Sequence, residues 1–251
     1  MGALFHTFIY QPLYNTLIFL YNVIPGADFG IAIIAITLLL RFLLVPIYKK
    51  QIESQKKLQE LQPKIKEVQK KTKGNKEQQA KELMELYKEH KTNPFSGCLP
   101  LIIQLIFLIA IYRILINISD AGLTVNPSEL YSFIESPGQI NQFFISIVDL
   151  TKPSIAIAAL AAIAQFFQTK MLMLKSQKDK KETADKNEED QQPDIAQMMS
   201  KQMLFLGPIL TLVIGIKFAA GLSLYWLTST LFMLAQQIYI QKKENGTTQT
   251  N

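Results

Sequence analysis

Five long runs of apolar residues, almost free of charge, constrain this 251-residue chain more than any other feature of its sequence. A bilayer core about 30 Å thick is crossed by a helix of about 20 apolar residues. Three runs satisfy this length directly, and the last two are separated only by Ala219 and Ala220, as expected for a tight helical hairpin. We therefore predict an all-α integral membrane protein with five transmembrane helices. The five predicted spans are residues 29–47, 95–118, 155–174, 204–218 and 221–240.

Lysine is concentrated in two of the segments that connect these spans. Residues 49–91 contain thirteen lysines and residues 170–201 contain seven, whereas residues 1–28 and 117–151 contain neither lysine nor arginine. Short loops rich in Lys and Arg stay on the cytoplasmic side of a membrane. We therefore expect the N-terminus outside and the C-terminus in the cytoplasm. The net charge of +6 then reflects membrane orientation, and we expect no sequence-specific nucleic-acid partner.

The segments between the predicted spans differ in pattern. Residues 1–28 are predicted to be an external amphipathic segment, because Pro12 would kink a spanning helix; the alternative is a sixth span. Residues 48–94 are predicted to form a cytoplasmic helical hairpin, with Pro63 kinking its first helix and Gly74 in its turn. This hairpin is either a solvated connector or a docking arm for partners. The remaining predicted segments are an external loop at 119–154, a mobile cytoplasmic loop at 175–203 and a short cytoplasmic tail at 241–251.

Polar side chains inside the predicted spans are energetically costly, so they indicate helix pairing or function. Arg41 follows the start of its span by twelve residues, which places it about 18 Å deep and just past the midplane. Arg41 alone could extend to the headgroups, but polar residues at similar depth in other spans favour a shared hydrated cavity. No span contains Asp or Glu to neutralise Arg41, so this cavity should attract acidic groups. The other candidates are Gln104, Gln165, Thr228, Ser229 and Gln237.

The chain lacks the residues that most catalytic and metal sites need. Its single cysteine, Cys98, excludes a disulfide framework, and His6 and His90 both lie outside the predicted spans. The sequence contains no phosphate-binding glycine loop and no intramembrane His, Asp or Glu for proteolysis or proton relay. We therefore expect no enzyme activity, no metal and no cofactor. A small solute transporter or channel is the alternative function, although five spans with unlike loops lack the paired repeats of transporters.

Four motifs resemble those of the YidC/Oxa/Alb family of membrane insertases. They are LRFLLVP at 40–46, LQP at 61–63, NPFSGCLPLIIQL at 93–105, and AGLSLYW at 220–226 followed by AQQ at 235–237. The motifs occur in the order of the family, and the similarity covers residues 10–243, nearly the whole chain. The chain is therefore similar to the short form of the family, which lacks a large external domain.

The resemblance implies a membrane protein insertase and chaperone of the bacterial plasma membrane. Such a protein guides hydrophobic segments of newly made proteins from the cytoplasm into the bilayer, alone or beside the Sec translocon. The implied partners are nascent membrane proteins with acidic or polar translocated segments, the lipid bilayer, the signal recognition particle receptor and the ribosome. Arg41 matches the arginine of the family's hydrophilic groove, and Gln165 and Trp226 occupy positions similar to its polar and aromatic residues. The tail after Ile240 has only two lysines, which argues against a ribosome-binding tail.

Overall fold

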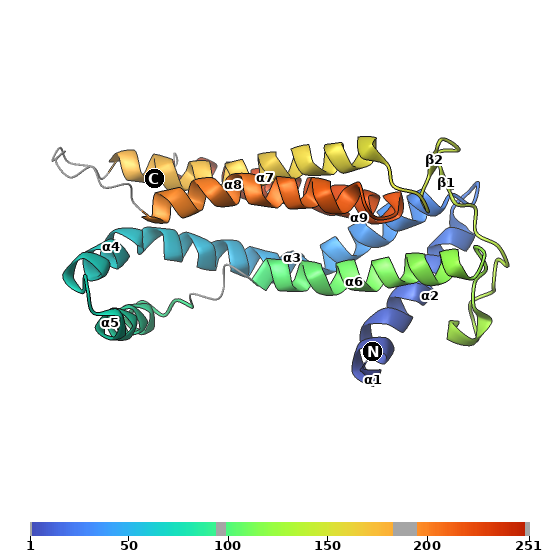
Figure 1. The fold of residues 1–251 in the computed structure, drawn as a ribbon, viewed down its shortest axis with the longest axis horizontal. Coiled ribbons are helices and arrows are strands. Elements are labelled where there is room, and N and C mark those ends of the chain that lie inside the picture. The colour runs from blue at the N-terminus through green and yellow to red at the C-terminus, as the bar shows by residue number, and fades with distance from the viewer. Residues whose placement is uncertain (1, 94–98, 183–194, 249–251) are drawn as a thin grey trace. The chain divides into compact units, whose positions relative to one another are not determined.

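The computed structural model describes residues 2–93, 99–182 and 195–248, and most of them are helical (Figure 1). They divide into two compact units, Met1–Arg41 with Phe107–Asn251, and Phe42–Ile106. Among the described residues, two helices are long and apolar enough to cross a membrane, and two shorter helices are also apolar. The first two are Phe29–Ser54 and Ile102–Asp120, and the shorter two are Ile155–Met171 and Leu204–Gly215.

Among the described residues, the longest connection between helices is residues 121–154, between α6 and α7. The N-terminal elements are α1 (Ala3–Phe5), the π-helix η1 (His6–Tyr10) and α2 (Gln11–Val23). The next helices are α3 (Phe29–Glu60), α4 (Gln62–Lys71), α5 (Lys76–Glu89) and α6 (Leu99–Asp120). The last elements are the 3-10 turn η3 (Pro127–Glu129), β1 (Phe143–Phe144), β2 (Val148–Asp149), α7 (Ile155–Glu182), α8 (Ile195–Gly215) and α9 (Ala220–Thr248).

Helix α3 continues well past the predicted end of the first span. It contains Pro46, which has no N–H to donate to the carbonyl of Phe42, yet the helix runs on to Glu60. The break in the helix comes at Leu61, and Pro63 lies in the first turn of α4, where its missing N–H leaves no helical hydrogen bond unmade. Pro63 therefore begins a new helix, which corrects the prediction that it kinks a continuous one.

In the second unit, α4 and α5 contact each other. Leu61 and Ile65 are buried, whereas Met84 of α5 is 48% exposed. The predicted turn between these helices contains Gly74 at φ +99°, a conformation that glycine adopts without strain. The side chain of Asn75 then caps α5 by accepting a backbone N–H from its first turn.

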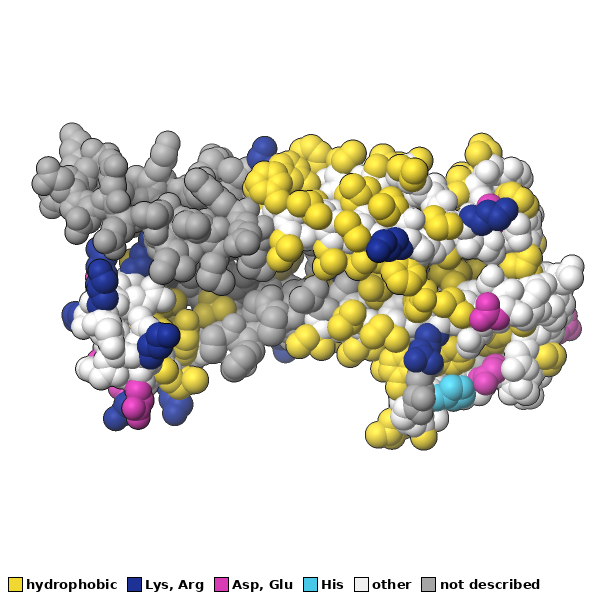
Figure 2. Space-filling model, in the orientation of Figure 1, with side chains coloured by type: hydrophobic (Ala, Val, Ile, Leu, Met, Phe, Trp, Pro, Cys, Tyr) yellow, Lys and Arg dark blue, Asp and Glu magenta, His cyan; other side chains and the backbone are white. Residues whose placement is uncertain are grey.

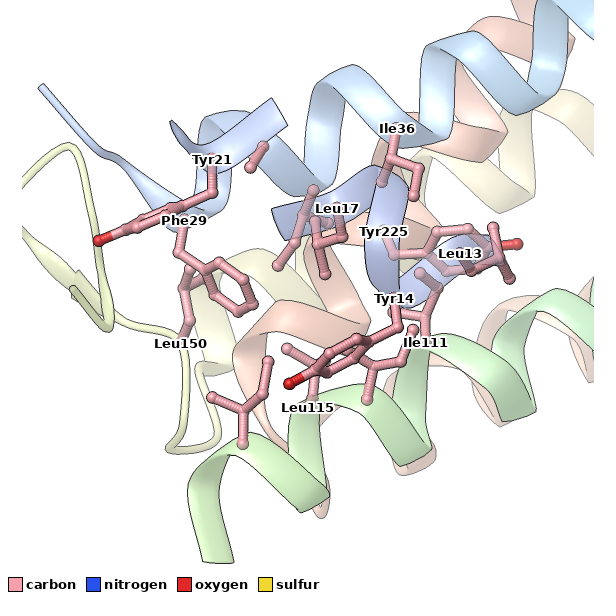
Figure 3. Packing of buried hydrophobic residues seen from close by; sticks show 14 of the residues in the cluster. Leu13, Tyr14, Leu17, Tyr21, Phe29, Ile36, Ile111, Leu115, Leu150 and Tyr225 are labelled. Atoms are coloured by element: carbon pink, nitrogen blue, oxygen red, sulfur yellow. The ribbon is translucent and has the colours of Figure 1, made fainter. Parts of the chain in front are cut away.

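The N-terminal segment has a buried face as well as an exposed one. Tyr14, Leu17 and Ile18 of α2 are at most 2% exposed, whereas Phe8 and Phe19 are more than half exposed. Figure 3 shows Tyr14 and Leu17 among side chains of α3, α6 and α9, within one hydrophobic cluster. Apolar side chains of this segment thus point in two directions, and one set packs against other helices while the other set is exposed. The predicted amphipathic segment is therefore part of the core of the first unit.

Side chains of α2 hold the loop between α6 and α7 by its backbone. The amide of Asn15, which is 1% exposed, donates to the carbonyl of Glu129 at 2.8 Å and accepts the N–H of Tyr131 at 2.6 Å. The hydroxyls of Tyr14 and Tyr21 accept two further backbone N–H groups of the loop, at 2.9 and 2.8 Å. The loop therefore has a fixed conformation although it contains little regular secondary structure.

A short β-hairpin in this loop departs from the predicted all-α fold. Strands β1 and β2 are antiparallel, with Phe144 opposite Val148. The backbone N–H of Ile145 donates to the carboxylate of Asp28 at 2.6 Å, just before α3 begins. A Cβ on Gly30 would come within 2.7 Å of the Cβ of Phe144, so the hairpin packs directly on the first turn of α3.

Helix α7 contacts both α8 and α9. A Cβ on Gly215 would lie 2.6 Å from the Cβ of Ala158, so this glycine allows α8 to approach α7 closely. Helices α7 and α8 extend into both ends of the segment that the sequence predicts as a mobile loop. The middle of that segment, residues 183–194, and the end of the predicted tail, residues 249–251, lie outside the described residues.

Candidate functional site around Arg41

Arg41 lies in the interior of the first unit, in the middle of α3. Its side chain is 3% exposed, and its Nη2 donates a hydrogen bond to the hydroxyl of Ser229 on α9. Ser229 is itself fully buried. A guanidinium group keeps its positive charge at all physiological pH values. The burial and the contact with α9 therefore favour an inward-facing charge over a side chain that extends along the helix to the headgroups.

The same face of α3 carries a second polar residue. Thr37 precedes Arg41 by four residues, so the two side chains lie one above the other on the helix. Thr37 is fully buried, and its hydroxyl donates to the carbonyl of Ile33 at 2.6 Å. Thr37 was not among the predicted site residues, although its four-residue spacing from Arg41 was a signal that could have identified it.

A polar cluster joins α7 to α9. The hydroxyl of Thr230 donates to Oε1 of Gln165 at 3.4 Å, and Nε2 of Gln168 contacts the sulfur of Met233 at 3.5 Å. We call these four residues the α7–α9 polar cluster. Oε1 of Gln168 is buried and has no hydrogen-bond partner among the described residues. An unpaired buried acceptor costs about 1–3 kcal/mol, so this oxygen is a position where a water molecule or an incoming donor would bind favourably.

The predicted residues on α9 do not all share one face. Trp226, Ser229 and Gln237 lie on one stripe, since they are spaced by three and eight residues along a helix of 3.6 residues per turn. Trp226 is partly exposed and Gln237 is 6% exposed. Thr228 points to another side of the helix, and its hydroxyl donates to the carbonyl of Leu224 at 2.8 Å. Thr228 therefore does not belong to the same stripe.

The predicted set thus divides into groups. Arg41 and Ser229 are in direct contact, and Gln165 contacts Thr230. Gln104 is partly buried in the part of α6 that belongs to the second unit, so its place in the site stays a prediction. Gln168 was not predicted as a site residue, although it follows Gln165 by three residues and so shares its face of α7.

The geometry suits binding better than bond-making chemistry. A buried cation, a serine hydroxyl and side-chain amides offer a charge and hydrogen bonds to an acidic or polar group. Among the described residues, no group of three or more His, Cys, Asp or Glu side chains is arranged to hold a metal ion. The arrangement can therefore lower the energy of a polar group that has left bulk water.

Comparisons with known proteins agree on one family. Residues 19–247 match the family model described as 60Kd inner membrane protein. A Fusobacterium nucleatum protein named membrane protein insertase YidC is 32% identical over 239 residues, which cover 94% of this chain and 98% of that protein.

Two other relatives carry similar names. A Streptomyces avermitilis protein, also named membrane protein insertase YidC, is 29% identical over 240 residues, and the match covers 88% of this chain and 54% of that protein. A Bacillus subtilis protein named membrane protein insertase MisCA is 30% identical over 223 residues, which cover 87% of this chain and 72% of that protein. The chain thus spans about half of the first of these relatives and most of the second.

Proposed function

Since this chain belongs to the 60Kd inner membrane protein family, we propose that it is a membrane protein insertase of the bacterial plasma membrane. The names of its relatives support that activity. We infer that its clients are newly made membrane proteins with acidic or polar segments that must cross the bilayer. It takes these clients up from the cytoplasm, alone or beside the Sec translocon. The signal recognition particle receptor and the ribosome are further proposed partners.

The single observation that carries the proposal is the buried positive charge of Arg41, which is 3% exposed. A charge at the bilayer centre costs about 2.5–3.5 kcal/mol on insertion scales. Opposite charges about 4 Å apart attract each other by about 4 kcal/mol at an effective dielectric constant near 20. The attraction by Arg41 therefore has the magnitude needed to offset the cost of one client carboxylate.

The α7–α9 polar cluster supports a hydrated path beside Arg41. The unpaired Oε1 of Gln168 and the weakly bonded Oε1 of Gln165 can both accept hydrogen bonds from water or from a client backbone. In a bilayer, an unsatisfied backbone amide costs several kcal/mol. In the proposed mechanism, Arg41 attracts the acidic side chains of a client while the glutamines satisfy its polar backbone.

The five-span topology, with the N-terminus outside, belongs to the same proposal. The lysine-rich segments support this orientation, because such segments remain in the cytoplasm. We also propose that α4 and α5 form a cytoplasmic arm that contacts clients or targeting partners. The continuous helix α3, which leads from the first apolar run into this lysine-rich segment, supports that role.

The test is insertion of a client series into liposomes that contain the purified full chain. The clients differ only in the number of acidic residues in the translocated segment. Arg41→Ala should impair the most acidic clients most, and Arg41→Glu should impair them further by repulsion. Arg41→Lys keeps the charge and should retain much of the activity, with only the guanidinium geometry lost.

The matched control is Arg113→Ala, because Arg113 is the other arginine of the chain and lies exposed on α6. This variant should insert every client like the parent protein. Equal impairment of neutral and acidic clients by Arg41→Ala would show that Arg41 maintains the shape of the site and does not attract charge. Solute uptake by the same liposomes without client insertion would favour the transporter function instead.

A further inference from the structure

The tip of the β1–β2 hairpin exposes large apolar side chains. Ile145 is 59% exposed and Ile147 is 80% exposed. Figure 2 shows hydrophobic side chains at this tip, at the upper right of the view. Exposed isoleucines at the end of a hairpin cannot be explained by packing inside the protein, because the buried contacts of the hairpin are made by Phe144 against the first turn of α3.

The backbone at the tip of the hairpin adopts a rare conformation. Ile145 has φ +52° and Ser146 has φ +58°, both in the left-handed region. Hairpin turns that need positive φ are usually formed by Gly, Asn or Asp. A β-branched residue with positive φ is an outlier. Since residues in rare backbone regions cluster at functional sites, the outward-facing isoleucine at this position suggests a use for its side chain.

Contacts to α3 fix the hairpin at the depth where an apolar helix begins. Asp28 binds the N–H of Ile145 through Oδ2 at 2.6 Å and the N–H of Ile31 through Oδ1 at 3.0 Å. The apolar run of α3 starts at the next residue, Phe29. The helix that follows the hairpin, α7, begins with Ile155, which is 73% exposed. Asp28 therefore holds the tip beside the first turn of α3, at the level where the apolar run begins.

The surroundings of the hairpin suit the surface of a bilayer. The carboxylate of Asp149 accepts hydrogen bonds from the hydroxyl and the N–H of Thr151 at 2.6 and 3.0 Å and lies 3.1 Å from Nζ of Lys152. The side chain of Lys152 is 77% exposed, so its ammonium group can also reach lipid phosphates. In Figure 1 the hairpin lies just beyond the N-terminal end of α7, at the end of the helices where a membrane surface would lie.

We propose that Ile145 and Ile147 insert into the outer leaflet of the bilayer and anchor the α6–α7 loop to the membrane surface. The insertion is shallow, since interfacial apolar groups reach about 5–10 Å into the boundary between headgroups and acyl chains. The anchor fixes the loop laterally beside α3, so that the loop closes the outer end of the first unit without crossing the bilayer. The proposal rests on the proposed orientation, with the α6–α7 loop outside, and does not depend on the client site at Arg41.

The test measures how deep a fluorophore on the tip lies in liposomes. The full chain carries Ile147→Cys in a Cys98→Ser background, labelled with a polarity-sensitive fluorophore. The matched control is Ser136→Cys, because Ser136 is exposed on the same loop but lies outside the hairpin. Lipids with a quencher near the headgroup should quench the probe at position 147 and shift its emission to the blue. External iodide should quench the probe at position 136 more strongly than the probe at position 147.

A second pair of variants tests whether the anchor depends on the packing of the hairpin against the first turn of α3. Gly30→Ala should displace Phe144 and so reduce lipid quenching at position 147, whereas Gly207→Ala should not, because a Cβ there meets no atom closer than 3.8 Å. Two results would overturn the proposal. One is iodide quenching at position 147 as strong as at position 136. The other is a probe that neither lipid quenchers nor iodide reach, since the tip would then be packed against protein.

Discussion

At the scale of single residues, the partner of Arg41 decides what the site can do. The hydroxyl of Ser229 accepts a hydrogen bond from the guanidinium but carries no charge of its own. A carboxylate in its place would cancel most of the positive field, as opposite charges do at close range. A serine therefore orients the guanidinium while leaving its positive field largely intact.

Water should reach the α7–α9 polar cluster but not the lipid-facing side of α7. Gln165→Cys, in a Cys98→Ser background, should react with a soluble thiol reagent added from the cytoplasm, because the reactive thiolate forms only in a hydrated site. Thr228→Cys should react more slowly, since Thr228 lies on another face of α9 and bonds its own helix. Leu160→Cys is the control, since Leu160 is 54% exposed on α7 and would face lipid. Equal rates at Gln165 and Leu160 would mean that the polar residues only pair the helices.

At the scale of elements, Asn15 makes two of the hydrogen bonds that attach α2 to the α6–α7 loop. Asn15→Ala would leave the carbonyl of Glu129 and the N–H of Tyr131 without this partner. The free energy of unfolding should fall by about 1–3 kcal/mol, as is typical when a buried polar group loses its partner. Thermal unfolding in detergent and protease cleavage within residues 121–150 would measure the change.

Asn22→Ala is the matched control for this prediction. Asn22 lies on the same helix and donates one exposed hydrogen bond to the carbonyl of Glu135 at 2.8 Å. Because water can replace an exposed bond, its loss should change stability by less than about 0.5 kcal/mol. Equal losses in the free energy of unfolding for the two substitutions would show that the burial of Asn15 does not increase its contribution to stability.

The proposed cytoplasmic arm can be tested as an element. Replacing residues 55–89 by a short linker should leave the first unit folded, since its hydrophobic cluster contains no residue of that segment. Client insertion should fall if α4 and α5 contact clients or targeting partners. Thermal unfolding of the shortened chain would confirm that the remaining helices are intact. Unchanged insertion would reduce the segment to a connector.

At the scale of the whole molecule, the lysine distribution predicts the orientation in the membrane. In a Cys98→Ser background, Ser132→Cys should react with an impermeant reagent in intact cells. Gln78→Cys, on α5, should react only after the membrane is permeabilised. Both side chains are exposed in the structure, so burial would not explain a failure to react. Labelling of Gln78→Cys in intact cells would reverse the proposed orientation and the direction from which the site is entered.

Much of the helical pattern could be predicted from sequence, because apolar runs and proline or glycine breaks are local signals. The depth of Arg41 and the polar residues in other spans predicted a hydrated cavity around it, and that cavity stays a prediction. The contact of Arg41 with Ser229 could not be predicted, since the two residues are 188 positions apart and meet only through the packing of α3 and α9. The burial of α2 was not predicted, because an apolar helix face has the same sequence pattern whether it packs against protein or against lipid. The hairpin was missed because strands of two residues have no detectable alternation.

The way α2 holds the α6–α7 loop has a consequence for how the sequence can change over evolution. Tyr14, Asn15, Tyr21 and Asn22 all bond to main-chain atoms of the loop. Every amino acid supplies the carbonyl, and every one except proline supplies the N–H. These bonds therefore depend little on which side chains the loop carries. Substitutions at the exposed positions of residues 126–141 can therefore accumulate while the loop keeps its path, whereas substitution of the four residues on α2 removes bonds that hold it. The conformation of the loop is therefore determined in part by a helix more than a hundred residues earlier in the chain.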